Sequence, residues 1–338
     1  MEPIRHTAPP DRIEGDSVTT VFITGGHSGI GLECSRQLAA RGSDIVLAGR
    51  SPARMQSVAD ELRAAHAVDI TLIELDTSSL ASVRTAAATC GSMIERGELP
   101  TLDALLCNAG GRFDGEVKYS QEGYELTFAT NCLGHFLLVE LLLPMMSTDG
   151  RVVFTASGTH DPDTMDGKVI GAAVEPNADA LAGDGKNGTK PLSAGKRYST
   201  SKLCTVMYAY ELARRLERSG SSIASIAYDP GAVSGTGFVR DMPKAVQWLS
   251  KTALTQWLSK HVGITTSTLE FSGAALADLA VDARYGTESG AYFQAREGKL
   301  SKVRSSEASY DEQRALTLWN DSKRLAGLLP DEEPTQLR

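Results

Sequence analysis

Tyr198 and Lys202 stand four residues apart in a stretch with helical periodicity, so their side chains share one face of a helix. A phenol ordinarily loses its proton far above neutral pH, and a cation one helical turn away favours the phenolate. Ser157, at the end of an apolar run, offers a hydroxyl that can bind a substrate oxygen. These three residues predict proton transfer to or from an oxygen atom.

A glycine-rich turn is the second chemical feature. Thr24, Gly25, Gly29 and Gly31 form the pattern T-G-x-x-x-G-x-G between the apolar residues 18–23 and a helical pattern. Gly25 permits backbone angles that a side chain forbids, Gly29 lets the main chain approach a pyrophosphate, and Gly31 lets the helix pack closely on the strand. The helix N-terminus favours phosphate through its N–H groups and its dipole. Taken alone, the turn has an ordinary tight loop as its alternative.

Further candidate cofactor residues lie in this turn and at the end of the next strand. Ser28 and Ile30 belong to the turn, as does His27, for which a surface position is the alternative. In dinucleotide-binding folds an acid near the end of the second strand binds the ribose 2′-OH, whereas an arginine can bind a 2′-phosphate. Arg50 stands at this point in place of an acid, with a solvent-facing arginine as the alternative. It favours NADP(H) over NAD(H).

The Y-x-x-x-K pair, the strand-end Ser157, Asn131 and the glycine turn together resemble the short-chain dehydrogenase/reductase family. The resemblance implies hydride transfer between a nicotinamide and a substrate carbon. In it Tyr198 exchanges a proton with the substrate oxygen, and Ser157 orients that oxygen. Lys202 holds the nicotinamide ribose and lowers the pKa of Tyr198, while Asn131 supports a water relay. The alternative for Asn131 is a satisfied structural amide, and His135 nearby is expected to be a packed or capping histidine.

The same resemblance assigns residues at other strand ends to the cofactor. Asp76 follows the third expected strand, where the family places an acid against the adenine side. The other residues that the resemblance assigns to the cofactor line the site of the adenine and ribose or the site of the nicotinamide: Tyr198, Lys202, Asn108, Ala109, Gly110, Pro230, Gly231, Val233 and Thr236.

Residues 158–197 form an unusually long interval between Ser157 and Tyr198, rich in Gly, Asp, Pro and Lys. Such a segment is expected to be a binding loop or a disordered insertion. Its start, G-T-H-D-P, and the sequence Y-x-x-x-K-L-C resemble the branch of retinol-dehydrogenase-like and light-dependent protochlorophyllide reductase-like enzymes. Ala232 stands where protochlorophyllide reductases carry a cysteine, which disfavours a chlorophyll precursor as substrate.

Short apolar runs alternate with helical patterns and predict a single-domain, Rossmann-type α/β fold with a doubly wound parallel sheet. We expect strands at 18–24, 44–48, 70–75, 102–107, 151–156, 223–228 and 290–294. We expect helices at 30–41, 53–67, 78–94, 124–146, 198–218, 267–281 and 310–328. The domain covers residues 17–330, between a flexible extension at 1–16 and a tail at 331–338. It includes the insertion 158–197 and a substrate lid at 235–265.

Composition excludes several functional classes. With 34 Lys and Arg against 42 Asp and Glu, the net charge is −8, and no basic stripe indicates a nucleic-acid partner. Five scattered cysteines lack metal-ligand spacing, so we predict no metal and a reducing cytoplasm. We find no apolar signal core and expect no run long enough to cross a bilayer. The tryptophans of residues 241–261 are candidates for a substrate lid or for contact with a membrane surface. A pair of helices that closes over the core is the favoured alternative.

These features predict an NADP(H)-dependent oxidoreductase that acts on the carbonyl or alcohol of a fairly large, apolar small molecule. One alternative keeps the fold and reduces a ring C=C bond of a tetrapyrrole-like pigment. Another is a non-enzymatic NADPH-binding sensor. The apolar residues 137–143 resemble a helix that forms dimers in the family, yet members with long insertions can be monomeric. Both a monomer and a homodimer therefore stay open.

Overall fold

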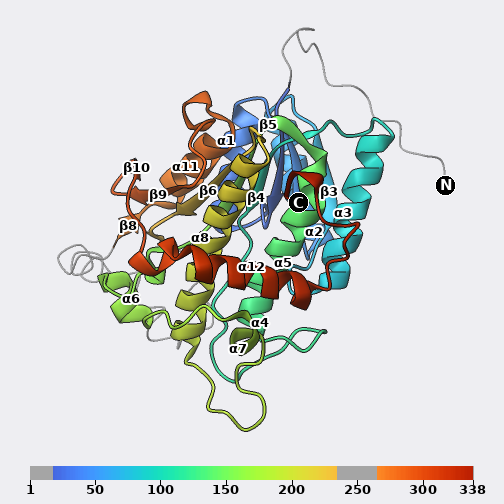
Figure 1. The fold of residues 1–338 in the computed structure, drawn as a ribbon. Coiled ribbons are helices and arrows are strands. Elements are labelled where there is room, and N and C mark those ends of the chain that lie inside the picture. The colour runs from blue at the N-terminus through green and yellow to red at the C-terminus, as the bar shows by residue number, and fades with distance from the viewer. Residues whose placement is uncertain (1–17, 234–264, 338) are drawn as a thin grey trace.

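The computed structural model describes residues 18–233 and 265–337 (Figure 1). Within this part of the chain, one sheet has the strand order β10-β9-β6-β5-β4-β1-β2-β3. Its neighbouring strands are parallel except for the antiparallel pair β9 and β10. The order reverses between β1 and β4, the point at which open α/β sheets bind ligands. The extension 1–16, Thr236 and nearly all of the expected lid lie outside the described residues.

The strands are short apolar runs, and every residue of β1, β2 and β6 is buried, as expected for a sheet covered on both faces. Their bounds are β1 Thr20–Thr24, β2 Asp44–Gly49, β3 Ile70–Glu74, β4 Leu102–Cys107, β5 Met146–Thr155, β6 Ala224–Asp229, β9 Ala291–Arg296 and β10 Lys299–Lys302. A separate pair joins β7 Ala232–Val233 to β8 Thr266–Ser267. The expectation that residues 290–294 form the last strand was wrong. Glu297 and Gly298 both take positive φ and turn the chain into β10.

Helices cover both faces of the sheet, which confirms the doubly wound α/β architecture. One face carries α1 Gly29–Ala40, α2 Pro52–Ala65 and α11 Leu269–Val281. The other carries α3 Leu80–Glu95, α5 Gly134–Leu142 and α8 Ala194–Arg218. The C-terminal helix α12, Glu312–Ala326, runs across α8 and α5 (Figure 1).

The insertion 158–197 is not the irregular loop that its composition suggests. It contains α6 Met165–Ile170 and α7 Ala178–Ala182, each with a side-chain cap at its N-terminus, from Thr164 and Asn177. Such short helices bury too few residues to show periodicity, and their caps supply the missing stability. Ser193 caps α8, which begins four residues before Tyr198.

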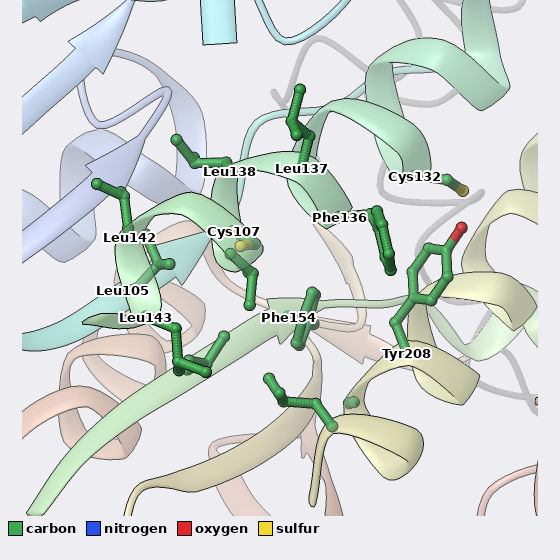
Figure 2. Packing of buried hydrophobic residues seen from close by; sticks show 14 of the residues in the cluster. Leu105, Cys107, Cys132, Phe136, Leu137, Leu138, Leu142, Leu143, Phe154 and Tyr208 are labelled. Atoms are coloured by element: carbon green, nitrogen blue, oxygen red, sulfur yellow. The ribbon is translucent and has the colours of Figure 1, made fainter. Parts of the chain in front are cut away.

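The expected helix 124–146 is interrupted. It consists of α4 Leu126–Phe128, a π-helical turn Ala129–Leu133, α5, and a 3-10 turn Leu143–Met145. Figure 2 shows side chains of α5 packed among residues of β4, β5 and α8. The span Leu126–Met145 is long and apolar enough to cross a membrane, contrary to our expectation, but most of it is buried inside the protein.

Candidate active site

The predicted catalytic residues meet at the carboxyl edge of the sheet, beside the switch point. Ser157 follows β5, Asn131 lies in the π-helical turn before α5, and Tyr198 and Lys202 come from the first half of α8. A π turn within an α-helix often marks a functional site, because it displaces one residue from the regular ladder. Here that turn contains Asn131.

Ser157 and Tyr198 are joined by a side-chain hydrogen bond. Ser157 Oγ also accepts two hydrogen bonds from Thr159. The Thr159 hydroxyl donates at 3.2 Å and the Thr159 backbone N–H donates at 3.4 Å. Because Ser157 Oγ accepts from Thr159, its own proton is available for a second oxygen. Sequence reasoning missed Thr159, whose only signal is a hydroxyl two residues beyond Ser157.

Tyr198 is buried, and burial raises the pKa of its phenol to about 12. The hydrogen bond from Ser157 and the charge of Arg112 act in the opposite direction, while Asp229 adds to the rise. The net effect of the surroundings is thus to raise this pKa, and the lowering expected from Lys202 stays a prediction. The Lys202 ammonium lies 5.7 Å from the centroid of the Tyr198 ring and donates to the Thr155 carbonyl at 2.7 Å.

Burial lowers the pKa of Lys202 to about 8, and Cys132 and Asp229 oppose this change. The ammonium is therefore the main form at neutral pH. A Cβ placed on Gly110 would lie 3.7 Å from Lys202 Nζ and 2.9 Å from Asn131 Oδ1. Gly110 thus brings the loop after β4 against both side chains.

The amide of Asn131 is satisfied by protein groups. Its Oδ1 accepts from the Gly111 N–H at 2.9 Å, and its Nδ2 donates to the Gly111 carbonyl and to Ser201 Oγ, both at 3.0 Å. The side chain thus holds the loop after β4 to α8, which agrees with the structural alternative. Its part in a water relay stays a prediction.

His135 is a packed histidine, as expected. Its Nε2 lies 3.0 Å from Thr24 Oγ1 and its Nδ1 lies 3.3 Å from the Asn131 carbonyl oxygen. Burial lowers the pKa of His135 to about 4, so the ring is neutral. It connects the glycine turn to the π-helical turn.

The glycine turn has the shape that a pyrophosphate requires. Gly25 and Gly29 take positive φ, and a Cβ on Gly31 would lie 2.4 Å from the Gly25 carbonyl oxygen. A Cβ on Gly29 would meet no described atom within 4 Å, so the space in front of α1 is open. Ser28 makes no side-chain cap among the described residues, so α1 presents its first N–H groups there. Ile30 belongs to the first turn of α1.

The end of β2 carries positive charge beside the glycine turn. Arg50 and Arg54 are both exposed, and both act on His27. Burial lowers the pKa of His27, and the charges of Arg54 and Arg50 lower it further. The sequence pattern singled out Arg50 and His27 but not Arg54, which lies four residues after Arg50, in the first turn of α2.

Comparisons with known proteins agree with this geometry. The short chain dehydrogenase family model matches residues 19–167. The chain is 33% identical over 319 residues to Dehydrogenase/reductase SDR family member 13 from Homo sapiens, covering 93% of this chain and 74% of the human protein. It belongs to the short-chain dehydrogenase/reductase family.

Other members of this family show how the similarity extends. The chain is 31% identical over 325 residues to a chloroplastic protochlorophyllide reductase from Daucus carota, covering 91% and 78% of the two chains. It is 34% identical over 241 residues to the short chain dehydrogenase/reductase dpchH from Colletotrichum higginsianum, and spans 58% of its length. The structure of L-sorbose reductase from Gluconobacter frateurii, complexed with NADPH and L-sorbose, matches with a TM-score of 0.60 at 19% identity. The match covers 83% of this chain and 96% of that one. The resemblance to this branch of the short-chain dehydrogenases/reductases is confirmed.

The remaining predicted cofactor residues lie along the same edge of the short-chain dehydrogenase/reductase sheet. The hydroxyl of Thr24 accepts from the N–H groups of Asn108 and Ala109, each at 2.9 Å, which ties β1 to the loop after β4. The Asp76 carboxylate accepts from the N–H and hydroxyl of Ser78, so it also shapes its own turn. Further along are Pro230, Gly231 with φ +72°, and Val233 in β7. Their contacts with a cofactor stay predictions.

Proposed function

We propose that this protein is an NADP(H)-dependent oxidoreductase that transfers a hydride between a nicotinamide and the carbonyl or alcohol carbon of a fairly large apolar substrate. The observation that carries the proposal is the hydrogen bond between Ser157 and Tyr198, with the Lys202 ammonium beside the same phenol ring. This arrangement places a hydroxyl that can bind oxygen (Ser157), a proton donor (Tyr198) and a cation (Lys202) together beside the switch point of the sheet.

The residues divide the work of a carbonyl reduction. NADPH, when bound, supplies the hydride. Tyr198, whose pKa of about 12 keeps it protonated at neutral pH, donates its proton to the substrate oxygen. Ser157 donates a hydrogen bond to the same oxygen and orients it. The charge of Lys202 stabilises the phenolate left on Tyr198.

The glycine turn and the end of β2 support NADP(H) as the cofactor. The uncapped start of α1 suits a pyrophosphate, and Arg50 with Arg54 suits a 2′-phosphate. The NADPH-bound L-sorbose reductase has the same fold. Asp76, Asn108 and the wall from Pro230 to Val233 complete the predicted contacts.

The test is NADPH oxidation in the dark against a panel of aldehydes, ketones and quinones, with wild type and Tyr198→Phe. We expect turnover with NADPH and a loss of about 10² to 10⁴-fold in Tyr198→Phe, because general acid catalysis is removed. NADPH binding, followed by its fluorescence, should stay nearly unchanged. Equal turnover by both proteins would refute the role of Tyr198.

Ring C=C reduction of a tetrapyrrole-like pigment is the second candidate, supported by the similarity to protochlorophyllide reductase. Ala232, in β7, argues against ring C=C reduction, because protochlorophyllide reductases carry a cysteine at this position. Illumination with NADPH and protochlorophyllide separates the two: product formed only in the light would favour the second candidate.

The packing of α12 supports a monomer. Trp319 of α12 contacts Phe136 of α5 with ring centroids 4.9 Å apart, and Tyr208 of α8 donates or accepts a hydrogen bond with Ser322 at 2.6 Å. The helix that resembles a family dimer helix is thus covered by the chain itself. Light scattering should give one chain per particle.

The five buried, unpaired cysteines support a cytoplasmic location.

A further inference from the structure

His160 bridges the predicted active site and a distant part of the chain. Its Nδ1 lies 2.7 Å from the carbonyl oxygen of Ser157, three residues earlier. Its Nε2 accepts from the backbone N–H of Ser306 at 3.0 Å, 146 residues later. The ring is buried and packs against Tyr292, with centroids 5.1 Å apart.

These two contacts define the tautomer of His160. The Ser306 N–H can only donate, so Nε2 carries no proton. The Ser157 carbonyl can only accept, so Nδ1 carries the proton and donates it. Burial lowers the pKa of His160, which favours this neutral form. The hydrogen bond to the Ser157 carbonyl acts in the opposite direction, as do the charges of Asp229 and Asp161.

The contact with Ser157 fixes a short and crowded segment. The Ser157 carbonyl also accepts from the His160 backbone N–H at 3.1 Å, closing the 3-10 turn Gly158–His160. A Cβ on Gly158 would lie 2.9 Å from Asp166 Oδ2 and 3.1 Å from Asp229 Oδ2. With the carbonyl held by His160 and the next residue confined, the peptide plane after Ser157 has one orientation. That plane contains Ser157 Cα, so it sets the position from which the Ser157 side chain reaches Tyr198.

We propose that His160 is a positioning residue that aims the Ser157 hydroxyl by tying the Ser157 carbonyl to the C-terminal segment at Ser306. The proposal rests on the proposed role of Ser157 in binding the substrate oxygen. His160 itself touches no reacting atom and acts through the main chain.

Two substitutions separate the two contacts. The side-chain amide nitrogen of asparagine and Nδ1 of histidine are both two bonds away from Cβ. His160→Asn therefore keeps a donor for the Ser157 carbonyl and loses the acceptor for the Ser306 N–H. The amide of glutamine reaches the position of Nε2, so His160→Gln keeps the acceptor and loses the donor. We expect kcat to fall at least about tenfold in His160→Gln, because a misplaced group loses catalytic orientation, with KM for NADPH unchanged. His160→Asn should keep kcat within about threefold and lose more thermal stability, since it leaves the buried Ser306 N–H unpaired.

If His160 had a purely structural role, kcat would fall with the melting temperature, so that His160→Asn would lose more activity than His160→Gln. That result, or equal losses of kcat in the two variants, would overturn the proposal. Ser157→Ala is the reference for the mechanism. In that background His160→Gln should cause no further loss of kcat, because the two residues act as one unit. Normal turnover by Ser157→Ala alone would instead refute the proposed function.

Amide hydrogen exchange gives a readout that needs no substrate. His160→Gln should speed exchange over residues 158–161, whereas His160→Asn should speed it at residues 305–307 only. Identical exchange patterns in the two variants would overturn the proposal whatever the enzyme assay shows.

Discussion

Arg197 and Glu125 form an ion pair in which each side chain is only 3% exposed, with Arg197 Nε 3.2 Å from Glu125 Oε1. Arg197 is the neighbour of Tyr198 in α8, and Glu125 caps the start of the helix that carries Asn131. Arg197 also donates to the carbonyl oxygen of Leu192 at 2.6 Å. The pair therefore helps to set the position of Tyr198, the proposed proton donor, relative to Asn131.

Removing one member of this pair should destabilise the fold strongly. Arg197→Met leaves the Glu125 carboxylate buried without its partner, and we expect a loss of about 3–5 kcal/mol in the free energy of unfolding. Urea denaturation measures it. Arg96→Met is the control, since the Arg96 and Glu98 side chains are 56% and 51% exposed and such pairs contribute about 0–1 kcal/mol. Equal losses in the two variants would contradict the importance of burial.

Gly110 and Gly111 should differ sharply in their tolerance of a methyl group. A Cβ on Gly110 would press on Asn131 Oδ1 at 2.9 Å, whereas a Cβ on Gly111 would meet only Phe113 Cζ, at 3.7 Å, among the described atoms. We expect Gly110→Ala to cost about 1–3 kcal/mol of stability by overpacking and to reduce kcat by displacing the Asn131 amide. Thermal melts and turnover measure both effects. A loss in Gly111→Ala as large as that in Gly110→Ala would refute this reasoning.

Local patterns were sufficient to predict the main elements and to propose a catalytic set, whose roles stay predictions. The four-residue spacing of Tyr198 and Lys202 determines a shared helix face, and glycine turns constrain the backbone wherever they occur. The sheet of short buried runs was likewise predictable, and the expected strand at 102–107 coincides with β4.

The missed features depend on contacts between distant residues or on small local departures. His160 and Ser306 are 146 positions apart, and no spacing rule joins them. The π turn around Asn131 leaves the apolar pattern of its helix unchanged, so it is invisible in the sequence. The pKa of Tyr198 could not be predicted for a similar reason. The sequence reveals the charged neighbour Lys202 but not how deeply the phenol is buried.

Arg50 and Arg54 should determine the preference for NADPH. A charge-assisted hydrogen bond is worth about 1.5–3 kcal/mol, so we expect Arg50→Ala and Arg54→Ala each to weaken NADPH binding by about ten- to a hundredfold. NADH, which lacks the 2′-phosphate, should bind as in the wild type. Arg36→Ala is the control, because Arg36 pairs with Glu61 on α2 at a distance of 2.8 Å. Parallel losses of NADPH and NADH binding, followed by fluorescence titration, would disprove the assignment.

Glu140 of α5 is fully buried, and neither of its carboxylate oxygens has a hydrogen-bond partner within the described residues. Burial raises its pKa from 4.5 to about 7, Glu333 adds to the rise, and Lys323 and Arg215 oppose it. The folded state therefore favours the protonated acid.

Because the folded-state pKa of Glu140 is raised, its stabilising contribution is complete below pH 4.5 and is lost as the pH rises through 7. A difference of this size corresponds to about 3 kcal/mol between the two limits. Glu140→Gln keeps the shape of the neutral acid and cannot ionise, so it should raise the stability much more at pH 8 than at pH 5, where most of the loss has not yet occurred. Urea denaturation at the two pH values measures the difference, with the exposed Glu116→Gln as the control. A gain at pH 8 no greater than that of Glu116→Gln would show that Glu140 is ionised in the fold at no cost.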